Sequence, residues 1–542
     1  MRNTLRLMCS VGAFAMLLGC SMGEAATAEF QPNPVNVESG GPETPPDERV
    51  ALLLQEAKQS YDDRYYEQSF RLAEKAQTLI VDNQFPIEDE VMALNIQGYC
   101  LLQLGRIDDY FITGFGVQKG AITKFKSALK FTPTDYRARL GVALAQFRRH
   151  GDTIRKAETL GSGALFLEQA REDTRRGFRT EGQAGVDLLR DVQRRLLQFK
   201  ANREKLVELG YIFNDPSVKP FNDKGERLGA PWLGKLKDVD APLVLNDAIW
   251  IIEDAIAGEA LTEKDRNLAL NNLLRLADDW RHVQSYWRKS AMADLQESRD
   301  GLLGVRESYK AYFWVDRELV FVYQSIGAFF LDIAMDQARV TAISQGATPA
   351  TLEAEAKKVF LAPEFDTWEK KQSAKNYKDA LAYISSFVIK HREFELSRTE
   401  AAEKKSLDDD NGNPFLVDLV QRYRATMDEL VSEERNLRAL MVLEAASLCV
   451  EPLFQISDIP AAISWANQYQ AMYPSKPMHH FVRATAYYQG KDWEDALREY
   501  RAFLRESSIT TDDAQRKICR ERILQCEREL SRAGGAGESA QK

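Results

Sequence analysis

Apolar residues recur at three- and four-residue spacing through almost the whole chain from Arg49 to Leu530. This spacing places them on one face of an α-helix, and short stretches of Gly, Pro, Asn or Asp separate one such run from the next. The alternation of apolar and polar residues that is typical of β-strands is nearly absent. The sequence therefore predicts an all-α protein of helices joined by short connections.

Small and aromatic residues repeat at fixed positions near both ends of this helical region. Ala121, Phe125, Ala128 and Pro133 lie in one predicted helix, and Gly98 lies in the helix before it. The pattern resembles the tetratricopeptide repeat (TPR), in which small residues lie where two helices cross and a proline ends the second helix. Three further segments carry the resemblance in Ala57, Tyr66, Ser69, Ala73 and Ala76, in Ala462, Ala466, Tyr469 and Pro474, and in Ala484, Tyr487, Gly490, Ala496, Tyr500 and Phe503.

The first twenty residues resemble a bacterial lipoprotein signal. Arg2 and Arg6 flank the start of an apolar stretch at 7–18, which is too short to span a bilayer as a stable helix. The stretch ends in LLGC at 17–20, and the resemblance implies cleavage before Cys20 and lipidation of its sulfur. Acyl chains of this kind hold a protein on a membrane. The resemblance predicts a protein of the cell envelope, anchored in the outer membrane and facing the periplasm.

The two resemblances together divide the chain. TPR-like pairs stack into an α-solenoid, because each pair leaves an apolar face that the next pair covers. The predicted segments are a signal peptide at 1–19, the lipidated cysteine with a Pro/Gly/Glu-rich tether at 20–48, N-terminal TPR-like repeats at 49–160, degenerate helical hairpins with an irregular loop 214–234 at 161–430, C-terminal TPR-like repeats at 431–533, and a disordered tail at 534–542.

Four cysteines remain after the predicted processing. Cys519 and Cys526 lie two turns apart on one predicted helix, roughly 10 Å, which is too far for a disulfide between them. A disulfide between Cys100 and Cys449 is left as an alternative by the sequence. Buried free thiols are the favoured interpretation.

The glycines at 114, 116 and 120 raise the question of a phosphate-binding loop. Their spacing is GxGxxxG, one residue longer than the dinucleotide fingerprint, and no buried strand precedes them. In the TPR register they end an insertion at roughly 107–117, in the turn between two helices. The sequence therefore favours an insertion over a nucleotide site.

The search for catalytic or metal-binding motifs is negative. His479 and His480 are neighbours and cannot both face one ligand from a helix, and His391 begins HREFE, which lacks the second histidine of HExxH. The segment LDDDNG at 407–412 has Leu407 where a calcium loop requires aspartate. With a net charge of −9 and no uncompensated basic tract, nucleic acid is also disfavoured. The sequence predicts no enzyme, no cofactor, no metal and no small-molecule substrate.

Three features indicate binding of a protein partner. The insertion carries aromatic residues on a connection expected to be exposed, and the irregular stretch at 214–234 has the length of a functional loop. The first helix of each repeat projects side chains into a groove. The candidate residues are Lys58, Tyr61, Asn95, Tyr99, Arg139, Phe481 and Tyr488 on the helices, with Tyr110, Phe111 and Phe115 in the insertion. They do not form the Lys/Asn/Asn/Lys/Arg clamp of chaperone-binding TPR domains, so recognition of a chaperone's C-terminal carboxylate is disfavoured.

The sequence therefore predicts a membrane-anchored scaffold or adaptor lipoprotein that mediates protein–protein interactions in a bacterial envelope assembly. One alternative is a glycan-binding surface lipoprotein of the SusD type, which also combines a lipidated cysteine with TPR-like helices. That family's aromatic-rich helix followed by a Tyr-Gly-Asp-Val-Pro-like turn is not found here. A second alternative is an enzyme built on helical hairpins, which would need a site that the sequence does not display.

Overall fold

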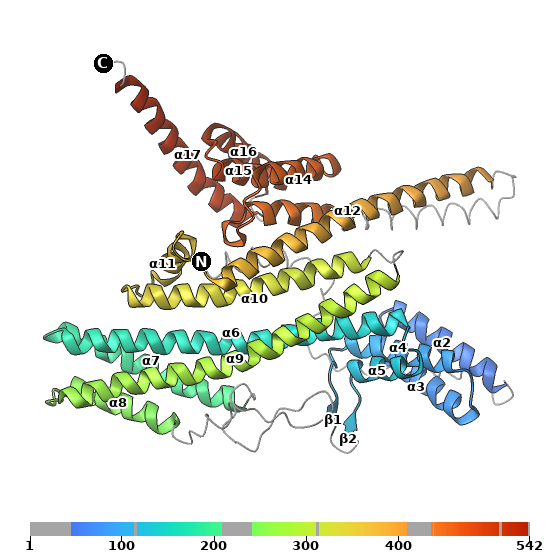
Figure 1. Ribbon diagram of the computed structural model, residues 1–542, viewed down its shortest axis with the longest axis horizontal. Coiled ribbons are helices and arrows are strands. Elements are labelled where there is room, and N and C mark those ends of the chain that lie inside the picture. The colour runs from blue at the N-terminus through green and yellow to red at the C-terminus, as the bar shows by residue number, and fades with distance from the viewer. Residues whose placement is uncertain are drawn as a thin grey trace. The chain divides into compact units, whose positions relative to one another are not determined.

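The computed structural model describes residues 45–112, 116–208, 241–309, 314–408, 435–436, 438–508 and 512–539 (Figure 1). The signal peptide, Cys20, nearly all of the tether, the irregular loop 214–234 and Phe115 lie outside these ranges. The chain forms two compact units, one built from residues 39–301 and 332–367 and the other from residues 302–331 and 368–542. Each unit is described by itself.

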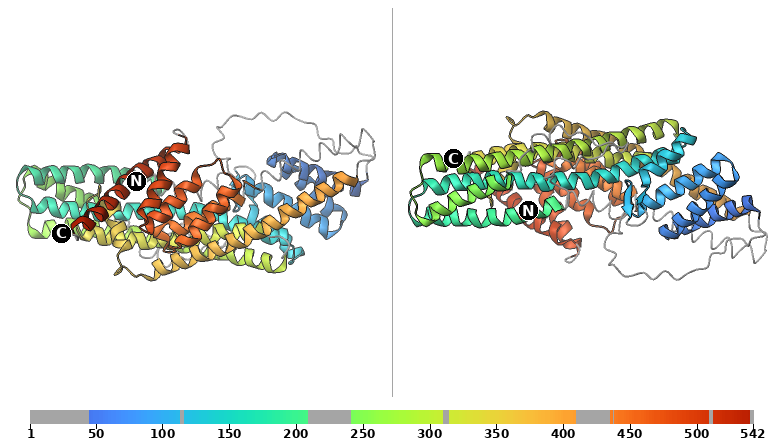
Figure 2. Two further views of the ribbon diagram at one scale, coloured as in Figure 1. Left: turned by 90° about the horizontal axis from the view of Figure 1, so that it is seen from above. Right: turned by 90° about the horizontal axis from the view of Figure 1, so that it is seen from below.

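The first unit begins with helical hairpins that follow the TPR-like register. The helices are α2 (Pro46–Asp62), α3 (Tyr66–Asn83), α4 (Ile87–Gln103), α5 (Ala121–Phe131) and α6 (Tyr136–Arg179). Each helix packs against the next, and α4 also contacts both α2 and α6 (Figures 1 and 2). This is the neighbour pattern of stacked helical pairs. The predicted helical-hairpin repeat, resembling TPR domains, is confirmed.

Phe125 on α5 shows why the repeat requires small residues. A Cβ atom on Gly98 of α4 would lie 2.6 Å from the Phe125 ring, and one on Gly141 of α6 would lie 2.3 Å from it. Neither distance is possible for a real side chain, so both glycines are needed for α4 and α6 to approach the ring. Phe125 itself is fully buried, as are Ala121 and Ala128.

The insertion between α4 and α5 contains the two described strands, a short hairpin among the helices of the described chain. Strands β1 (Tyr110–Ile112) and β2 (Gly116–Gln118) pair antiparallel, with Tyr110 opposite Gln118. The base of the hairpin is part of the fold: Ile107 is buried, and the Asp109 carboxylate accepts hydrogen bonds from the Gly120 N–H (2.9 Å) and the Thr123 hydroxyl (2.7 Å). The predicted insertion limits of 107–117 were therefore too wide, because residues 107–109 anchor α5.

Helix α6 continues beyond the hairpins and is followed by α7 (Gln183–Glu208), α8 (Ala241–Ala257) and α9 (Glu263–Ser308). Their apolar faces share one core around Leu160, Leu196, Ile252 and Leu273. The predicted segment boundary at 160/161 lies inside α6.

The glycines in GSG at 161–163 do not end α6. A Cβ on Gly161 would lie 2.1 Å from the Gln284 amide nitrogen, and one on Gly163 would lie 2.0 Å from the Trp280 ring. Both glycines therefore mark the place where α9 approaches α6 closely.

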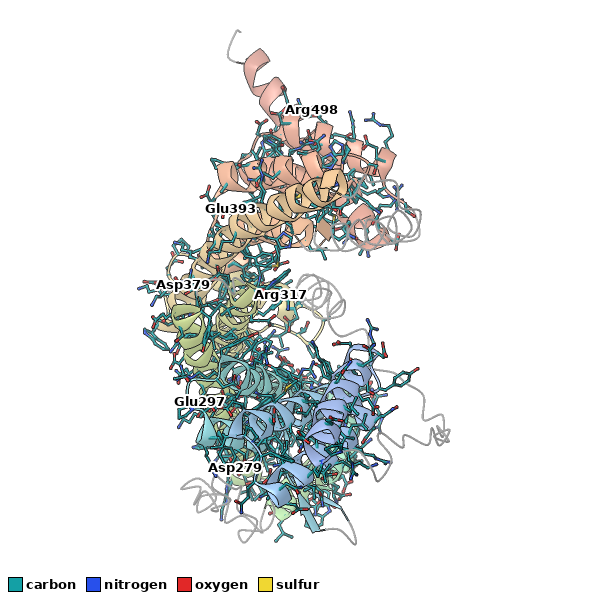
Figure 3. All side chains as sticks on the ribbon, turned by 90° about the vertical axis from the view of Figure 1, so that its right-hand side faces the viewer. Asp279, Glu297, Arg317, Asp379, Glu393 and Arg498 are labelled. Carbon is teal, nitrogen blue, oxygen red and sulfur yellow. The ribbon has the colours of Figure 1, made fainter. Side chains whose placement is uncertain are left out.

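Polar contacts also join α6 to α9 on the N-terminal side of Gly161, and we call this row of contacts the polar seam. The Arg149 guanidinium binds the Asp294 carboxylate (2.9 Å from Nε), and the Ser298 hydroxyl donates to the Ala143 carbonyl (2.8 Å). Gln146 donates to Glu297, which is labelled in Figure 3. Burial raises the pKa of the Asp294 carboxyl to about 6, against the opposing effect of Arg149.

Helix α10 (Trp314–Ser344) is the one described helix long and apolar enough to cross a membrane by length and composition, and half of its most apolar window is buried inside the structure. Its polar residues have partners: Arg288 binds Asp332 and Asp336, and Arg339 binds Glu353 (3.1 Å) on α11 (Leu352–Leu361).

The second unit contains α12 (Trp368–Asp408), a helical stretch at 438–450, the short 3₁₀ helix η1 (Pro452–Phe454), α14 (Ile459–Met472), α15 (Met478–Gln489), α16 (Trp493–Glu506) and α17 (Asp513–Ser539). The last four helices pack in sequence order. Ala484, Ala496 and Tyr500 are fully buried at the helix crossings, as the register predicted. Cys100, Cys449, Cys519 and Cys526 are buried free thiols, which agrees with the favoured interpretation.

Candidate protein-binding face

The first helices of the N-terminal hairpins present a row of aromatic rings. Tyr61 at the end of α2 contacts Tyr66 (5.3 Å between ring centroids) and Tyr99 of α4 (6.5 Å), and Tyr99 contacts Phe125 (4.9 Å). Tyr61 and Tyr99 are only half-buried, whereas Phe125 is fully buried. The row therefore starts in the core and ends at the surface. We define the N-terminal face as the surface formed by Lys58, Tyr61, Tyr99, Gln103 and Arg148.

Polar side chains hold this face in place. The Gln103 amide donates to the Tyr61 hydroxyl (3.2 Å), and Arg148 of α6 donates to the Gln103 side-chain oxygen (3.3 Å). The Tyr99 hydroxyl donates to the Arg137 carbonyl (2.8 Å), which ties α4 to the first turn of α6. Burial raises the pKa of the Tyr61 phenol, so this group stays a neutral hydrogen-bonding hydroxyl. These contacts connect α2, α4 and α6 across the face.

Two residues predicted to line the groove, Asn95 on α4 and Arg139 on α6, form hydrogen bonds within the hairpins. Asn95 is 5% exposed, and its amide donates to the Asp135 carboxylate (2.6 Å), which also caps α6 by accepting from the Ala138 N–H (3.1 Å). This corrects its placement on the groove: Asn95 steadies a helix start. Arg139 is half-buried, and its Nε donates to the Pro133 carbonyl (2.9 Å). Lys58 is exposed.

The insertion residues are only partly covered by the structure. Tyr110 and Phe111 lie in β1, but their side chains are outside the described part of the chain. Whether they extend the N-terminal face therefore stays a prediction.

Of the two candidate residues in the C-terminal hairpins, one is buried and the other is half-buried. Phe481 is 8% exposed and packs against Phe503 (5.4 Å) and Tyr500 (6.5 Å), so it is a core residue and its placement on a groove was wrong. Tyr488 is half-buried, with its ring against Trp493 (5.4 Å) and under the Arg522 guanidinium (5.0 Å).

Arg522 fixes this second site. Its guanidinium donates to the Tyr500 hydroxyl (2.7 Å) and to the Thr485 hydroxyl (3.0 Å). Burial raises the pKa of Tyr500 to about 12, so a neutral hydroxyl accepts these bonds.

Sequence reasoning missed Gln103, Arg148 and Arg522. Gln103 follows Tyr99 by one helical turn and could have been placed on the same side of α4. Arg148 and Arg522 come from other helices, and no local pattern connects them to the tyrosines. Within the described ranges, no group of three or more His, Cys, Asp or Glu residues could hold a metal ion.

Comparison with known proteins gives no family. No protein-family model and no curated protein matches the chain. Among solved structures, the chain is similar to the crystal structure of the P58(IPK) TPR domain at 12% identity, over 89% of this chain and 99% of that chain, with a TM-score of 0.17. It is also similar to yeast Tom70 at 11% identity, over 89% and 97% of the two chains, with a TM-score of 0.16. TM-scores this low carry no argument about function, and the repeat assignment rests on the hairpins described above.

Proposed function

We propose that this protein is a membrane-anchored scaffold or adaptor lipoprotein whose TPR-like hairpins bind protein partners in a bacterial envelope assembly. The observation that carries the proposal is the N-terminal face. Its tyrosines are half-exposed, and both are hydrogen-bonded within the hairpins: the Tyr61 hydroxyl accepts from Gln103, and the Tyr99 hydroxyl donates to the Arg137 carbonyl. Aromatic and arginine side chains are the groups that dominate binding energy in protein interfaces, and rigid presentation lowers the entropy cost of association.

The same face argues for a protein partner over a reacting substrate. Its polar groups are hydroxyl, amide and guanidinium groups engaged with one another, an arrangement that offers hydrogen bonds and apolar contact. A stacked-hairpin surface of this kind extends over several helices, which suits an extended segment of another protein. A glycan array tests the SusD-type alternative: specific binding of an oligosaccharide would favour that alternative over the scaffold.

The membrane anchor is the second part of the proposal and rests on the LLGC sequence at 17–20. Replacing Cys20 by Ser removes the sulfur that would carry the diacylglycerol. We expect Cys20→Ser to lose metabolic labelling with palmitate completely and to accumulate as the unprocessed precursor. Cys9→Ser is the matched control and should be labelled like the wild type. Retained label in Cys20→Ser would show that the anchor is wrong, whatever the outcome for the N-terminal face.

A further inference from the structure

Helix α8 is apolar on two sides, although only one side contacts the core. Val244, Ala248 and Ile252 belong to the core shared with α6, α7 and α9. On the other side, the side chains of Leu243 and Trp250 are exposed, with relative exposures of 54% and 55%. Large apolar side chains that gather on one exposed side of a helix mark a candidate interaction site. The helix lies along the edge of its group of helices in Figure 1.

The exposed apolar residues alternate with carboxylates in one stripe. Leu243 and Trp250 are seven residues apart, about 10 Å along the axis, and Asp247 and Asp254 each follow one of them at four residues. Residues at these spacings share one side of a helix. We define the outer face of α8 as Leu243, Asp247, Trp250 and Asp254.

The charge of this face is uncompensated. Helix α8 has three carboxylates and no Lys or Arg in its sequence. Glu253 accepts a hydrogen bond from the Gln193 amide of α7 (2.7 Å), and it marks the edge of the face. Within the described ranges, neither Asp247 nor Asp254 forms an ion pair.

The neighbouring helix α7 is different. Its Asp187 pairs with Arg190 (3.5 Å), and its Asp191 pairs with Arg195 (2.9 Å). These two aspartates of α7 are therefore neutralised by cations of the same helix, whereas Asp247 and Asp254 have no such cation within the described ranges.

We propose that the outer face of α8 binds a basic amphipathic helix of another protein. Apolar residues of that helix at three- and four-residue spacing pack on Leu243 and Trp250, which is the helix-on-helix mode of peptide recognition. Lysine or arginine residues beside its apolar stripe meet Asp247 and Asp254, and this charge complementarity selects the partner and its register. The site is independent of the N-terminal face.

A designed peptide tests the proposal on the full-length chain. The probe is an 18-residue fluorescein-labelled helix with Leu in a helical stripe and Lys on both sides of it. One control peptide has every Lys replaced by Glu, and another has the same composition in scrambled order. By fluorescence anisotropy, we expect saturable binding of the Lys peptide only, weakening as salt is raised because the contact includes exposed charges.

Variants locate the site. Trp250→Ala should weaken binding by about tenfold or more, as loss of an aromatic anchor does. Trp368→Ala is the matched control, since Trp368 of α12 is another exposed tryptophan (59%), and should bind like the wild type. The double variant Asp247→Lys/Asp254→Lys should bind the Glu peptide and reject the Lys peptide. This reversal cannot result from unfolding.

Three results would overturn the proposal. They are equal affinity of the wild type and Trp250→Ala, unchanged peptide preference in the charge-reversed variant, and binding of the Lys peptide only after residues 209–240 are replaced by a Gly/Ser linker. The last result would assign the outer face of α8 to a segment of this chain instead of a partner.

Discussion

Replacing Phe125 by Ala is expected to destabilise the N-terminal hairpins by about 3–5 kcal/mol, the range for a large aromatic removed from a core. The ring is fully buried, and it fills the space that Gly98 and Gly141 leave open. Gly98 and Gly141 have no side chain that could fill the space left by the ring. Urea denaturation followed by circular dichroism at 222 nm measures the change.

Phe131→Ala is the matched control for this prediction. Phe131 ends the same helix and is 44% exposed, so its removal should cost far less. Equal destabilisation by the two substitutions would mean that Phe125 is not at a helix crossing and that the TPR-like register is wrong.

Replacing Arg149 by Met is expected to cost about 3–5 kcal/mol, because it leaves a buried carboxylate without its cation. Asp294 has a side-chain exposure of only 6%. Burial already raises the pKa of its carboxyl to about 6, above the ordinary value for aspartate, so the folded state favours the protonated form. The cost should therefore be smaller at pH 5 and grow as the pH rises through 6 toward 8, where the carboxyl must be ionised in the folded state.

Arg155→Met on the same helix provides the comparison. Arg155 pairs with Asp152, and the two side chains are 70% and 64% exposed. An exposed pair contributes about 0–1 kcal/mol, with little dependence on pH in this range. If thermal melts at pH 8 show the same loss for both variants, the polar seam between α6 and α9 does not hold the helices together.

Local sequence patterns predicted the hairpins because the residues that define each repeat lie close together in the sequence. Ala121, Phe125 and Ala128 lie within one helix, and their partners lie in the helices directly before and after it. The same reasoning did not anticipate the role of GSG at 161–163. There the glycines admit Trp280 and Gln284 from a helix more than a hundred residues later, and no local signal shows that approach.

The binding face was predicted only in outline for the same reason. Tyr61 and Tyr99 were found from their repeat positions, and both are partly exposed. Asn95 and Phe481 were placed on a groove because a helical projection shows which side of the helix a residue is on. It does not show whether a neighbouring helix covers that side. The hydrogen bonds of Asn95 to Asp135 and the contact of Phe481 with Phe503 depend on those neighbours. Ion pairs between helices far apart in the sequence, such as Arg149 with Asp294, could not be predicted either.

Site-specific photocrosslinking in living cells tests most directly whether the N-terminal face binds a partner. p-Benzoylphenylalanine replaces Lys58 in one strain and Val81 in another, since Lys58 is an exposed residue of the face and Val81 is 56% exposed on α3. We predict a discrete crosslinked product from position 58 that is absent from position 81 and is lost when Gln103→Ala removes the hydrogen bond to Tyr61. Equal products from both positions, or none from position 58 while the protein is folded and correctly localised, would contradict the account.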